Sequence, residues 1–205
     1  MKERLLIIGA GGHGKVVADI ALKMNQWDEI CFLDDDKTKR EVMGLKVIDS
    51  SSNVKSYLDD SDFFVAIGDN STRKKVIEEL LVEGIQLPTL LHPNAVIGQD
   101  VKIGQGTVIM AGVVINCCTE IGEGCIINTS SSIDHDNMIR DYVHISPGSN
   151  LAGSVKIGKE TWVGTGSTVI NNIEIYKKSI IGAGSLVIRD VKQEGTYIGT
   201  PLKKM

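Results

Sequence analysis

The sequence predicts an α/β domain followed by an all-β domain of short, stacked strands. Three observations predict this order. The chain of 205 residues opens with a strand, a glycine-rich loop and a helical pattern. An aliphatic residue then recurs at every sixth position from Ile97 to Val187, and the composition combines 22 glycines with only 4% aromatic residues. We therefore expect residues 1–90 to form the first domain and residues 91–205 the second.

The six-residue repeat predicts the architecture of the second domain. Each unit reads as a short strand and a turn, and successive coils would stack at the strand spacing of about 4.8 Å. The aliphatic residue points inward, and so does the mostly small or β-branched residue two places earlier, such as Thr107, because side chains alternate along a strand. We expect the Gly or Asn that often follows the aliphatic residue, as at Gly98 and Asn116, to supply the positive φ of a sharp corner. A period of six does not fit a helix of period 3.6.

The first domain alternates strands with helices. Residues 4–9 read as a buried strand, 15–24 as a helix, 30–33 as a second strand, 63–67 as a third strand and 71–83 as a helix capped by Ser71. This order predicts a parallel α/β sheet.

The loop Gly9-Ala10-Gly11-Gly12-His13-Gly14 fits the G-x-G-x-x-G pattern that follows a strand and opens a helix. Backbone N–H groups at a helix N-terminus bind phosphate oxygens. A domain of this size is roughly half of a full Rossmann fold, so we expect it to bind a nucleotide-sugar. NAD binding and a purely structural role of the glycines are the alternatives.

Composition excludes several classes of function. The net charge of −4 predicts no nucleic-acid partner, and no apolar run approaches the ~20 residues of a membrane span. The N-terminus lacks the pattern of a signal peptide, and four cysteines without metal-ligand spacing predict reduced thiols and a cytoplasmic location. We expect no metal site, because only His135 and His144 fall in the polar repeats and a zinc site would need three histidines.

The tandem I-G-x-x-[STAV]-x units and four further motifs resemble a known family. The motifs GAGGHGKVVADIA, FLDDD, FVAIGDNSTRKK and LLHPNAVIG occur in this order. Together they resemble the hexapeptide-repeat acetyltransferases of the sialic-acid O-acetyltransferase family in the broad sense, which includes the UDP-4-amino-sugar N-acetyltransferases of bacterial glycan pathways. The resemblance covers essentially the whole chain. It implies a left-handed parallel β-helix, acetyl-CoA as co-substrate, a nucleotide-sugar (UDP-linked) as acceptor, and a homotrimer with sites between subunits.

Acetyl transfer needs a base for the incoming amine or hydroxyl group and stabilisation of an oxyanion. His135 lies two residues after Ile133, so its side chain should point outward, and Asp134 or Asp136 would orient its ring. The resemblance assigns catalysis to His135 and Asp136, since the related N-acetyltransferases carry a catalytic histidine in the matching S-S-x-I-x-H stretch with an acidic residue after it. A plain surface role of His135 is the alternative.

The resemblance also assigns binding residues. It places Gly11, Gly12, His13, Asp34, Asp35, Gly68 and Asn128 at the nucleotide-sugar, and His144, Thr165 and Ala183 at acetyl-CoA. Thr165 and Ala183 would otherwise be ordinary corner residues, and Asp34 to Asp36 a solvated turn.

We therefore predict that the chain acetylates the amino group of a nucleotide-linked 4-amino sugar, with His135 as the general base. Acetylation of a hydroxyl group on sialic acid or a polysaccharide is the nearest alternative. A non-catalytic, nucleotide-binding trimer is the second.

Overall fold

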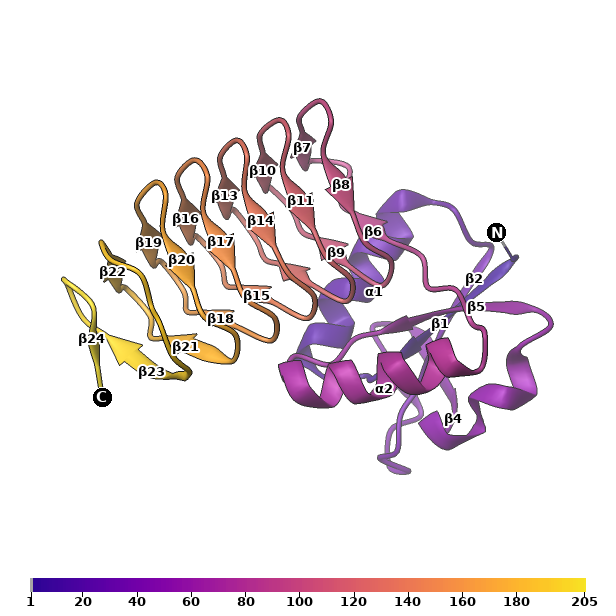
Figure 1. The fold of residues 1–205 in the computed structure, drawn as a ribbon. Coiled ribbons are helices and arrows are strands. Elements are labelled where there is room, and N and C mark those ends of the chain that lie inside the picture. The colour runs from indigo at the N-terminus through magenta and orange to yellow at the C-terminus, as the bar shows by residue number, and fades with distance from the viewer. Residues whose placement is uncertain (1) are drawn as a thin grey trace. The chain divides into compact units, whose positions relative to one another are not determined.

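The computed structural model describes residues 2–205. The chain divides into two compact units, the first ending at Pro93 and the second spanning Asn94–Met205, where the sequence suggested a boundary after residue 90. Figure 1 shows an α/β unit and a stack of coils. Within the described residues, none of the helices has the length and apolar character needed to span a bilayer.

The first unit is built on a five-stranded sheet in the order β3-β4-β2-β1-β5. The strands are β1 (Arg4–Ile8), β2 (Glu29–Leu33), β3 (Glu41–Val42), β4 (Leu45–Asp49) and β5 (Ser61–Val65). Strand β1 pairs in parallel with β2 and β5, and Leu6 lies opposite Cys31 and Phe63. Leu6 and Phe63 belong to the core, which is apolar on both faces of these strands, as expected for a parallel sheet.

The sheet is mixed rather than parallel throughout, which corrects the sequence-based prediction. Strand β3 runs antiparallel to β4. The two residues between them, Met43 and Gly44, have φ values of 56° and 76°. Two consecutive positive φ values make the tight turn that matches the twist of a hairpin, and Met at the first of these positions gives no sequence signal for such a turn.

Two helices connect the strands. Helix α1 (Gly12–Met24) packs on β1 and β2, and α2 (Asn70–Val82) packs on β5. A 3₁₀ helix spans Ser51–Tyr57, and the short strand β6 (Leu90–Leu91) follows α2. The cap of α2 is Asp69, whose Oδ1 accepts the Thr72 N–H at 2.8 Å, so the predicted Ser71 cap is wrong. The N-cap lies two residues before the predicted one because the helix already begins at Asn70.

The second unit is a parallel β-helix in which equivalent positions lie 18 residues apart, three six-residue units to a coil. Its strands form three faces. Face one consists of β7 (Val96–Ile97), β10 (Val114–Ile115), β13 (Ser132–Ile133), β16 (Asn150–Leu151), β19 (Thr168–Val169) and β22 (Leu186–Val187). Face two consists of β8 (Lys102–Ile103), β11 (Glu120–Ile121), β14 (Met138–Ile139), β17 (Lys156–Ile157) and β20 (Glu174–Ile175). Face three includes β9 (Val108–Ile109), β12 (Ile126–Ile127), β15 (His144–Ile145), β18 (Trp162–Val163), β21 (Ser179–Ile181), β23 (Gly195–Ile198) and β24 (Lys203–Lys204).

The interior confirms the predicted orientation of the repeat. The aliphatic residues from Ile109 to Val187 are all buried. The small residues two places earlier are also inward, and several of their hydroxyls donate to carbonyls of the following coil, as from Thr107 Oγ1 to Gly122 O at 2.8 Å and from Ser149 Oγ to Gly164 O at 2.9 Å. Each such bond contributes about 0.5–1.5 kcal/mol to stability. The hydroxyl groups of serine and threonine therefore have hydrogen-bond partners inside an otherwise apolar prism.

The glycines after the aliphatic residues have a different role from the predicted one. Positive φ occurs three residues after the aliphatic residue, for example at Asp100 (56°) and Asp136 (57°). Gly104, directly after Ile103, is instead required by packing. A Cβ there would lie 2.6 Å from the backbone carbon of Gly122 in the following coil, closer than real Cβ contacts allow.

Candidate functional site

The turn between β13 and β14 carries the predicted catalytic pair. His135 Nδ1 lies 2.7 Å from Oδ2 of Asp136, and both side chains are more than half exposed, at 53% and 59%. The predicted outward direction of His135 is therefore what the structure shows. An ionised carboxylate only accepts hydrogen bonds, so Nδ1 carries the proton and Nε2 carries the free lone pair.

Asp134 has a different task from Asp136. Its Oδ1 accepts the backbone N–H of His135 at 2.9 Å and the side-chain amide of Asn116 at 2.7 Å. Of the two carboxylates that flank the histidine, Asp136 is therefore the one that contacts the ring. The hydrogen bond that the His135 ring donates to Asp136, followed by the nearby charge of Asp134, raises the pKa of His135 above its ordinary value. The arrangement favours a protonated imidazole, which a base must form during proton transfer.

A second polar cluster lies on face three around His144. Its Nε2 is 3.1 Å from the amide nitrogen of Asn128 in the preceding coil. On its other side the imidazole stacks on Trp162, whose indole N–H donates to Ser146 Oγ at 2.7 Å. The structure thus brings together His144 and Asn128, which the sequence assigned to different ligands. Trp162 was missed, although it lies 18 residues, or one coil, after His144.

Thr165 and Ala183 are exposed at successive turns that follow strands of face three. The N–H of Gly184 donates to the carbonyl of Thr165 at 2.8 Å, so the two turns are in register. His135 follows a strand of face one instead. Within one chain, the strand before His135 and the strand of His144 belong to different faces of the prism.

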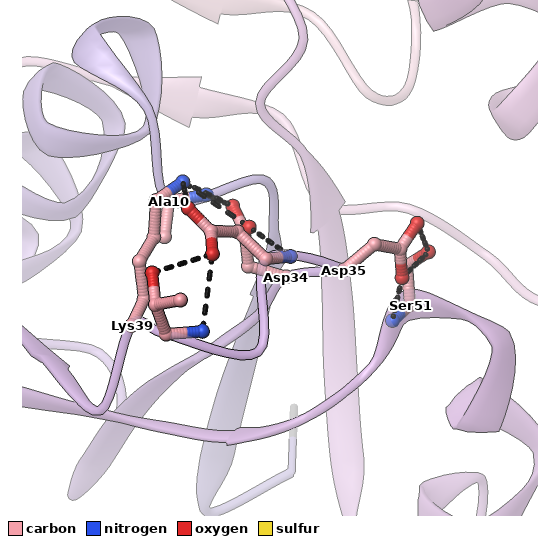
Figure 2. A network of polar contacts seen from close by, with 7 residues as sticks. Ala10, Asp34, Asp35, Lys39 and Ser51 are labelled. Carbon is pink, nitrogen blue, oxygen red and sulfur yellow. Dashed lines mark hydrogen bonds and ion pairs between the residues drawn. The ribbon is translucent and has the colours of Figure 1, made fainter.

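The glycine-rich loop of the first unit is held by Asp34, the first acidic residue after β2 (Figure 2). The Ala10 N–H donates to Asp34 Oδ2 at 2.7 Å, and Lys39 Nζ lies 3.1 Å from both Asp34 oxygens. Burial raises the pKa of Asp34, but the N–H groups of Ala10 and Asp36 and the Lys39 ammonium outweigh it, and the pKa lies below the usual value. Asp34 therefore braces the loop.

Asp35 points to the other side of the same segment. Its carboxylate accepts the Ser50 hydroxyl at 2.6 Å and the Ser51 N–H at 3.0 Å, and these bonds lower its pKa. Both carboxylates thus form hydrogen bonds within the chain. This segment is therefore neither a plain solvated turn nor a pair of free carboxylates.

Gly11, Gly12 and Gly68 border open space. A Cβ at any of the three would meet no atom within 4 Å. Arg73, which is only 1% exposed, holds the loop of Gly68 because its guanidinium donates to the carbonyls of Ile67 and Gly68 at 3.0 Å. Sequence analysis missed this role of Arg73, because an arginine in a helix is usually exposed.

His13 lies in the first turn of α1 and is half-buried. Burial lowers its pKa to about 4, with a further contribution from the charge of Arg73. Its Nε2 is buried and has no hydrogen-bond partner within the described chain. The imidazole is therefore neutral at physiological pH.

Among residues 2–205, no group of three or more His, Cys, Asp or Glu side chains is arranged to hold a metal ion. Stacked hexapeptide coils with an exposed histidine–carboxylate pair at one turn define the class of hexapeptide-repeat transferases.

Comparisons with known proteins narrow this class. A family model described as the PglD N-terminal domain matches residues 4–80, and a model described as bacterial transferase hexapeptide (six repeats) matches residues 100–135. The acetyltransferase domain of PglB from Neisseria gonorrhoeae FA1090, solved in complex with acetyl coenzyme A, is 37% identical with a TM-score of 0.97 over 100% of both chains. The chain belongs to the PglD-type family of hexapeptide-repeat acetyltransferases.

Other relatives agree with this assignment. A histidine-to-asparagine variant of perosamine N-acetyltransferase from Caulobacter crescentus, in complex with CoA and GDP-perosamine, is 35% identical, covers 98% of this chain and 96% of that chain, and has a TM-score of 0.94. The UDP-N-acetylbacillosamine N-acetyltransferase of Bacillus subtilis (strain 168) is 38% identical over 113 residues, 53% of this chain and 52% of that protein. The GDP-perosamine N-acetyltransferase of Escherichia coli O157:H7 is 30% identical over 118 residues, 55% of this chain and 53% of that protein. The chain spans about half the length of these two curated relatives.

Proposed function

We propose that this chain transfers the acetyl group of acetyl-CoA to the amino group of a nucleotide-linked 4-amino sugar, with His135 as the general base. The observation that carries the proposal is the 2.7 Å contact between His135 Nδ1 and Asp136 on an exposed turn. It fixes the tautomer whose Nε2 is free to accept a proton, and it stabilises the imidazolium that results. A surface histidine without a role would need no such partner.

The reaction balances with these groups alone. His135 Nε2 removes a proton from the sugar amino group as the amine nitrogen bonds to the thioester carbonyl carbon. The tetrahedral intermediate expels the CoA thiolate, and the imidazolium returns its proton to that sulfur. The products are an amide and the free thiol of CoA. A positioned general base contributes about 10²- to 10⁴-fold to such a step.

The first unit would hold the nucleotide at the start of α1. Gly11 is the N-cap, no side chain caps the helix, and the first turn contains no acidic residue. The N–H groups of that turn therefore remain for phosphate oxygens. We propose that Gly11, Gly12, His13 and Gly68 contact the nucleotide-sugar and that Asp34 and Asp35 hold the surrounding loops. A UDP-linked sugar is our first choice, as for the Bacillus relative, and a GDP-linked sugar is the other outcome of the test.

Charge on the three faces supports a homotrimer with sites between subunits. Four of the five outward strand residues of face two are charged, namely Lys102, Glu120, Lys156 and Glu174, and Lys102 Nζ lies 2.7 Å from a carboxylate oxygen of Glu120. The outward strand residues of face one are uncharged, namely Val96, Val114, Ser132, Asn150, Thr168 and Leu186. Association through uncharged faces avoids desolvating ions. A neighbouring copy would also bring the His144 cluster of one chain toward the His135 turn of another.

A hollow of about 490 Å³ on face one supports the same arrangement. Its lining includes Val114, Asn150, Thr168 and Asp134, the residue before His135. We propose that substrate reaches His135 along this face, that Asn128 lies near the acceptor sugar, and that His144, Thr165 and Ala183 line the acetyl-CoA channel. Because acetyl-CoA and nucleotide-sugars are made inside cells, the proposed reaction goes with a cytoplasmic location.

The experiment that tests the proposal measures thiol release from acetyl-CoA. Acceptors are UDP- and GDP-linked 4-amino sugars, free sialic acid and simple glycans, and His135→Ala is assayed in parallel. Turnover of one amino-sugar nucleotide that is lost in His135→Ala supports the proposal and identifies the nucleotide. Turnover of hydroxyl acceptors alone, or full activity of His135→Ala, would overturn it.

A further inference from the structure

Asn137 directly follows the pair of His135 and Asp136, and its side chain points into the β-helix, where it is only 1% exposed. It belongs to the inward series of residues that stand two places before an aliphatic residue. Asn137 is the only one of these sixteen residues with a side-chain amide, the others being Ala95, Val101, Thr107, Val113, Thr119, Cys125, Ser131, Val143, Ser149, Val155, Thr161, Ser167, Ile173, Ser179 and Ser185. The one amide of the series thus lies next to the proposed base.

The inward hydroxyls show which carbonyls a donor at this position can reach. Ser149 Oγ donates to the carbonyl of Gly164, 15 residues later in the following coil, at 2.9 Å. Ser131 Oγ instead donates to the carbonyl of Asn128, three residues earlier in its own turn, at 2.8 Å. A hydroxyl has one hydrogen and serves one of these carbonyls, whereas a side-chain amide has two hydrogens and can serve both.

Asn137 makes both bonds at once. Its Nδ2 lies 2.7 Å from the carbonyl oxygen of Asp134, three residues earlier, and 3.0 Å from that of Ala152, 15 residues later. It also lies 3.3 Å from the carbonyl oxygen of His135. From the preceding coil, Thr119 Oγ1 donates to the same Asp134 carbonyl at 2.9 Å. The turn that carries His135 is therefore tied to the coils on both sides.

These bonds leave one buried polar atom without a partner. Asn137 Oδ1 is buried and has no hydrogen bond within residues 2–205. The amide cannot be reversed, because Oδ1 would then face the carbonyl acceptors that Nδ2 now binds. A buried acceptor without a hydrogen bond lowers stability, and a serine that makes one bond, as Ser131 does, avoids this cost. Stability alone therefore does not explain an amide at this position.

We propose that Asn137 is a positioning residue for His135, an inference that rests on the proposed function. The imidazole and the Asp136 carboxylate both project from the turn whose carbonyls the amide binds. By fixing this turn to the following coil, Asn137 keeps the two side chains in contact and sets the direction of Nε2. Asn137 is buried inside the β-helix and acts through the turn.

Asn137→Ser is the variant that tests this role. Serine has one hydrogen, so it can hold the turn or bind the following coil but not both. We expect the contact between His135 and Asp136 to loosen and the imidazole pKa to fall toward its ordinary value. The other titratable groups of this corner stay in place, namely Asp134 in the same turn and Cys117 and Cys118 in the preceding one, and residues 152–155 of the following turn carry no charge.

The kinetic effect should fall on kcat. A misplacement of about 1 Å costs a reaction roughly 10²-fold, so we expect kcat to fall by about 10- to 100-fold while KM for acetyl-CoA changes less. The Tm should stay close to that of the wild type, because the unpaired Oδ1 is lost together with one hydrogen bond. Asn137→Thr fills more of the volume of the amide and also has one hydrogen. It should show the same losses, and it replaces the serine variant if that variant fails to fold.

Thr107→Val is the matched control. Thr107 Oγ1 donates to the carbonyl of Gly122 at 2.8 Å and accepts the Cys125 N–H at 3.0 Å, at a corner that follows face two rather than face one. Valine occurs at the same inward position elsewhere, as at Val113. The control loses interior hydrogen bonds, so it should lower Tm and leave the His135 pKa and kcat unchanged.

Three readouts decide the test: Tm, the His135 pKa followed by NMR in the free enzyme, and kcat. The inference holds if Asn137→Ser lowers the imidazole pKa and kcat while Thr107→Val lowers Tm alone. It is overturned if the pKa of Asn137→Ser matches the wild type, or if its kcat falls no more than that of Thr107→Val.

The NMR measurement separates this inference from the proposed function. If His135→Ala retains full activity, the proposed base is wrong, but the imidazole pKa in Asn137→Ser still reports whether Asn137 holds the ring. If His135→Ala is inactive and the imidazole pKa in Asn137→Ser is unshifted, the proposed function stands and the role of Asn137 is refuted.

Discussion

The imidazole of His144 lies parallel to the indole of Trp162, with ring centroids 5.7 Å apart and ring planes 3° apart. The two residues occupy the same position in successive coils, and His144 is paired with Trp162 in the register of β15 and β18. Asn128 approaches the imidazole from the preceding coil. The orientation of His144 is therefore fixed from both sides along the β-helix.

Trp162→Ala should weaken acetyl-CoA binding. Aromatic pairs contribute about 0.5–1.5 kcal/mol beyond their burial, so releasing His144 should raise KM for acetyl-CoA roughly 2- to 10-fold with a smaller effect on kcat. Trp162→Phe keeps a ring against His144 and loses only the bond to Ser146, so its KM should stay near the wild type. Initial-rate kinetics at saturating acceptor check both variants. Equal KM values for Ala and Phe would contradict a role of the stack.

Asp34→Ala should weaken binding of the nucleotide-sugar. The substitution removes the acceptor of the Ala10 N–H and of Lys39, so the glycine loop loses its brace. We expect the nucleotide-sugar Kd, measured by calorimetry, to rise by about 10-fold, the cost of losing a charge-assisted hydrogen bond. The matched control is Asp36→Ala, since Asp36 accepts bonds from Thr38, lies farther from Lys39 Nζ than Asp34 does, at 4.0 Å, and is 47% exposed. Similar Kd values for the two variants would show that the brace is unimportant.

The proposed assembly predicts different outcomes for lysines on two faces. Wild-type protein should sediment at roughly three times the chain mass of 22.2 kDa. Thr168→Lys introduces a charge in the uncharged hollow of face one and should shift the mass toward that of one chain, because the buried ammonium would lack a partner. Met138→Lys, on the charged face two, should leave the mass unchanged. Sedimentation equilibrium decides, and a monomeric wild type or a trimeric Thr168→Lys would refute the assignment of the interface.

The repeat was predictable from sequence because one strong constraint acts at every sixth residue. Inward aliphatic residues, the inward hydroxyls and the outward direction of His135 all follow from strand alternation. The positions with positive φ could not be predicted in this way. Gly104 is a glycine because two backbones approach each other closely there, and the repeat pattern does not distinguish that reason from a positive φ. In the first unit, the turn at Met43 and Gly44 was missed because methionine rarely occupies such a position.

The supporting contacts of the candidate site were the least predictable part. Asp34 reaches Ala10 across 24 residues, and Trp162 reaches His144 only because one coil contains 18 residues. Sequence reasoning placed Asp34 at the nucleotide but did not predict that its oxygens bond the glycine-rich loop itself. Contacts of this kind depend on the distance between coils and loops in space, which residue types alone do not specify.

The most direct test of the account is the pH dependence of kcat in the wild type and in Asp136→Asn. Asn suits the left-handed φ of 57° at this position, so the turn should be preserved. His135 acts as a base only when unprotonated, so kcat should rise with pH through its pKa, which Asp136 raises. Without the carboxylate that pKa falls. The account predicts that the acidic limb moves to lower pH and that the plateau drops by about 10-fold or more, since the imidazolium has lost its partner. An unshifted limb with an unchanged plateau would contradict the central claim that Asp136 tunes His135 as the base.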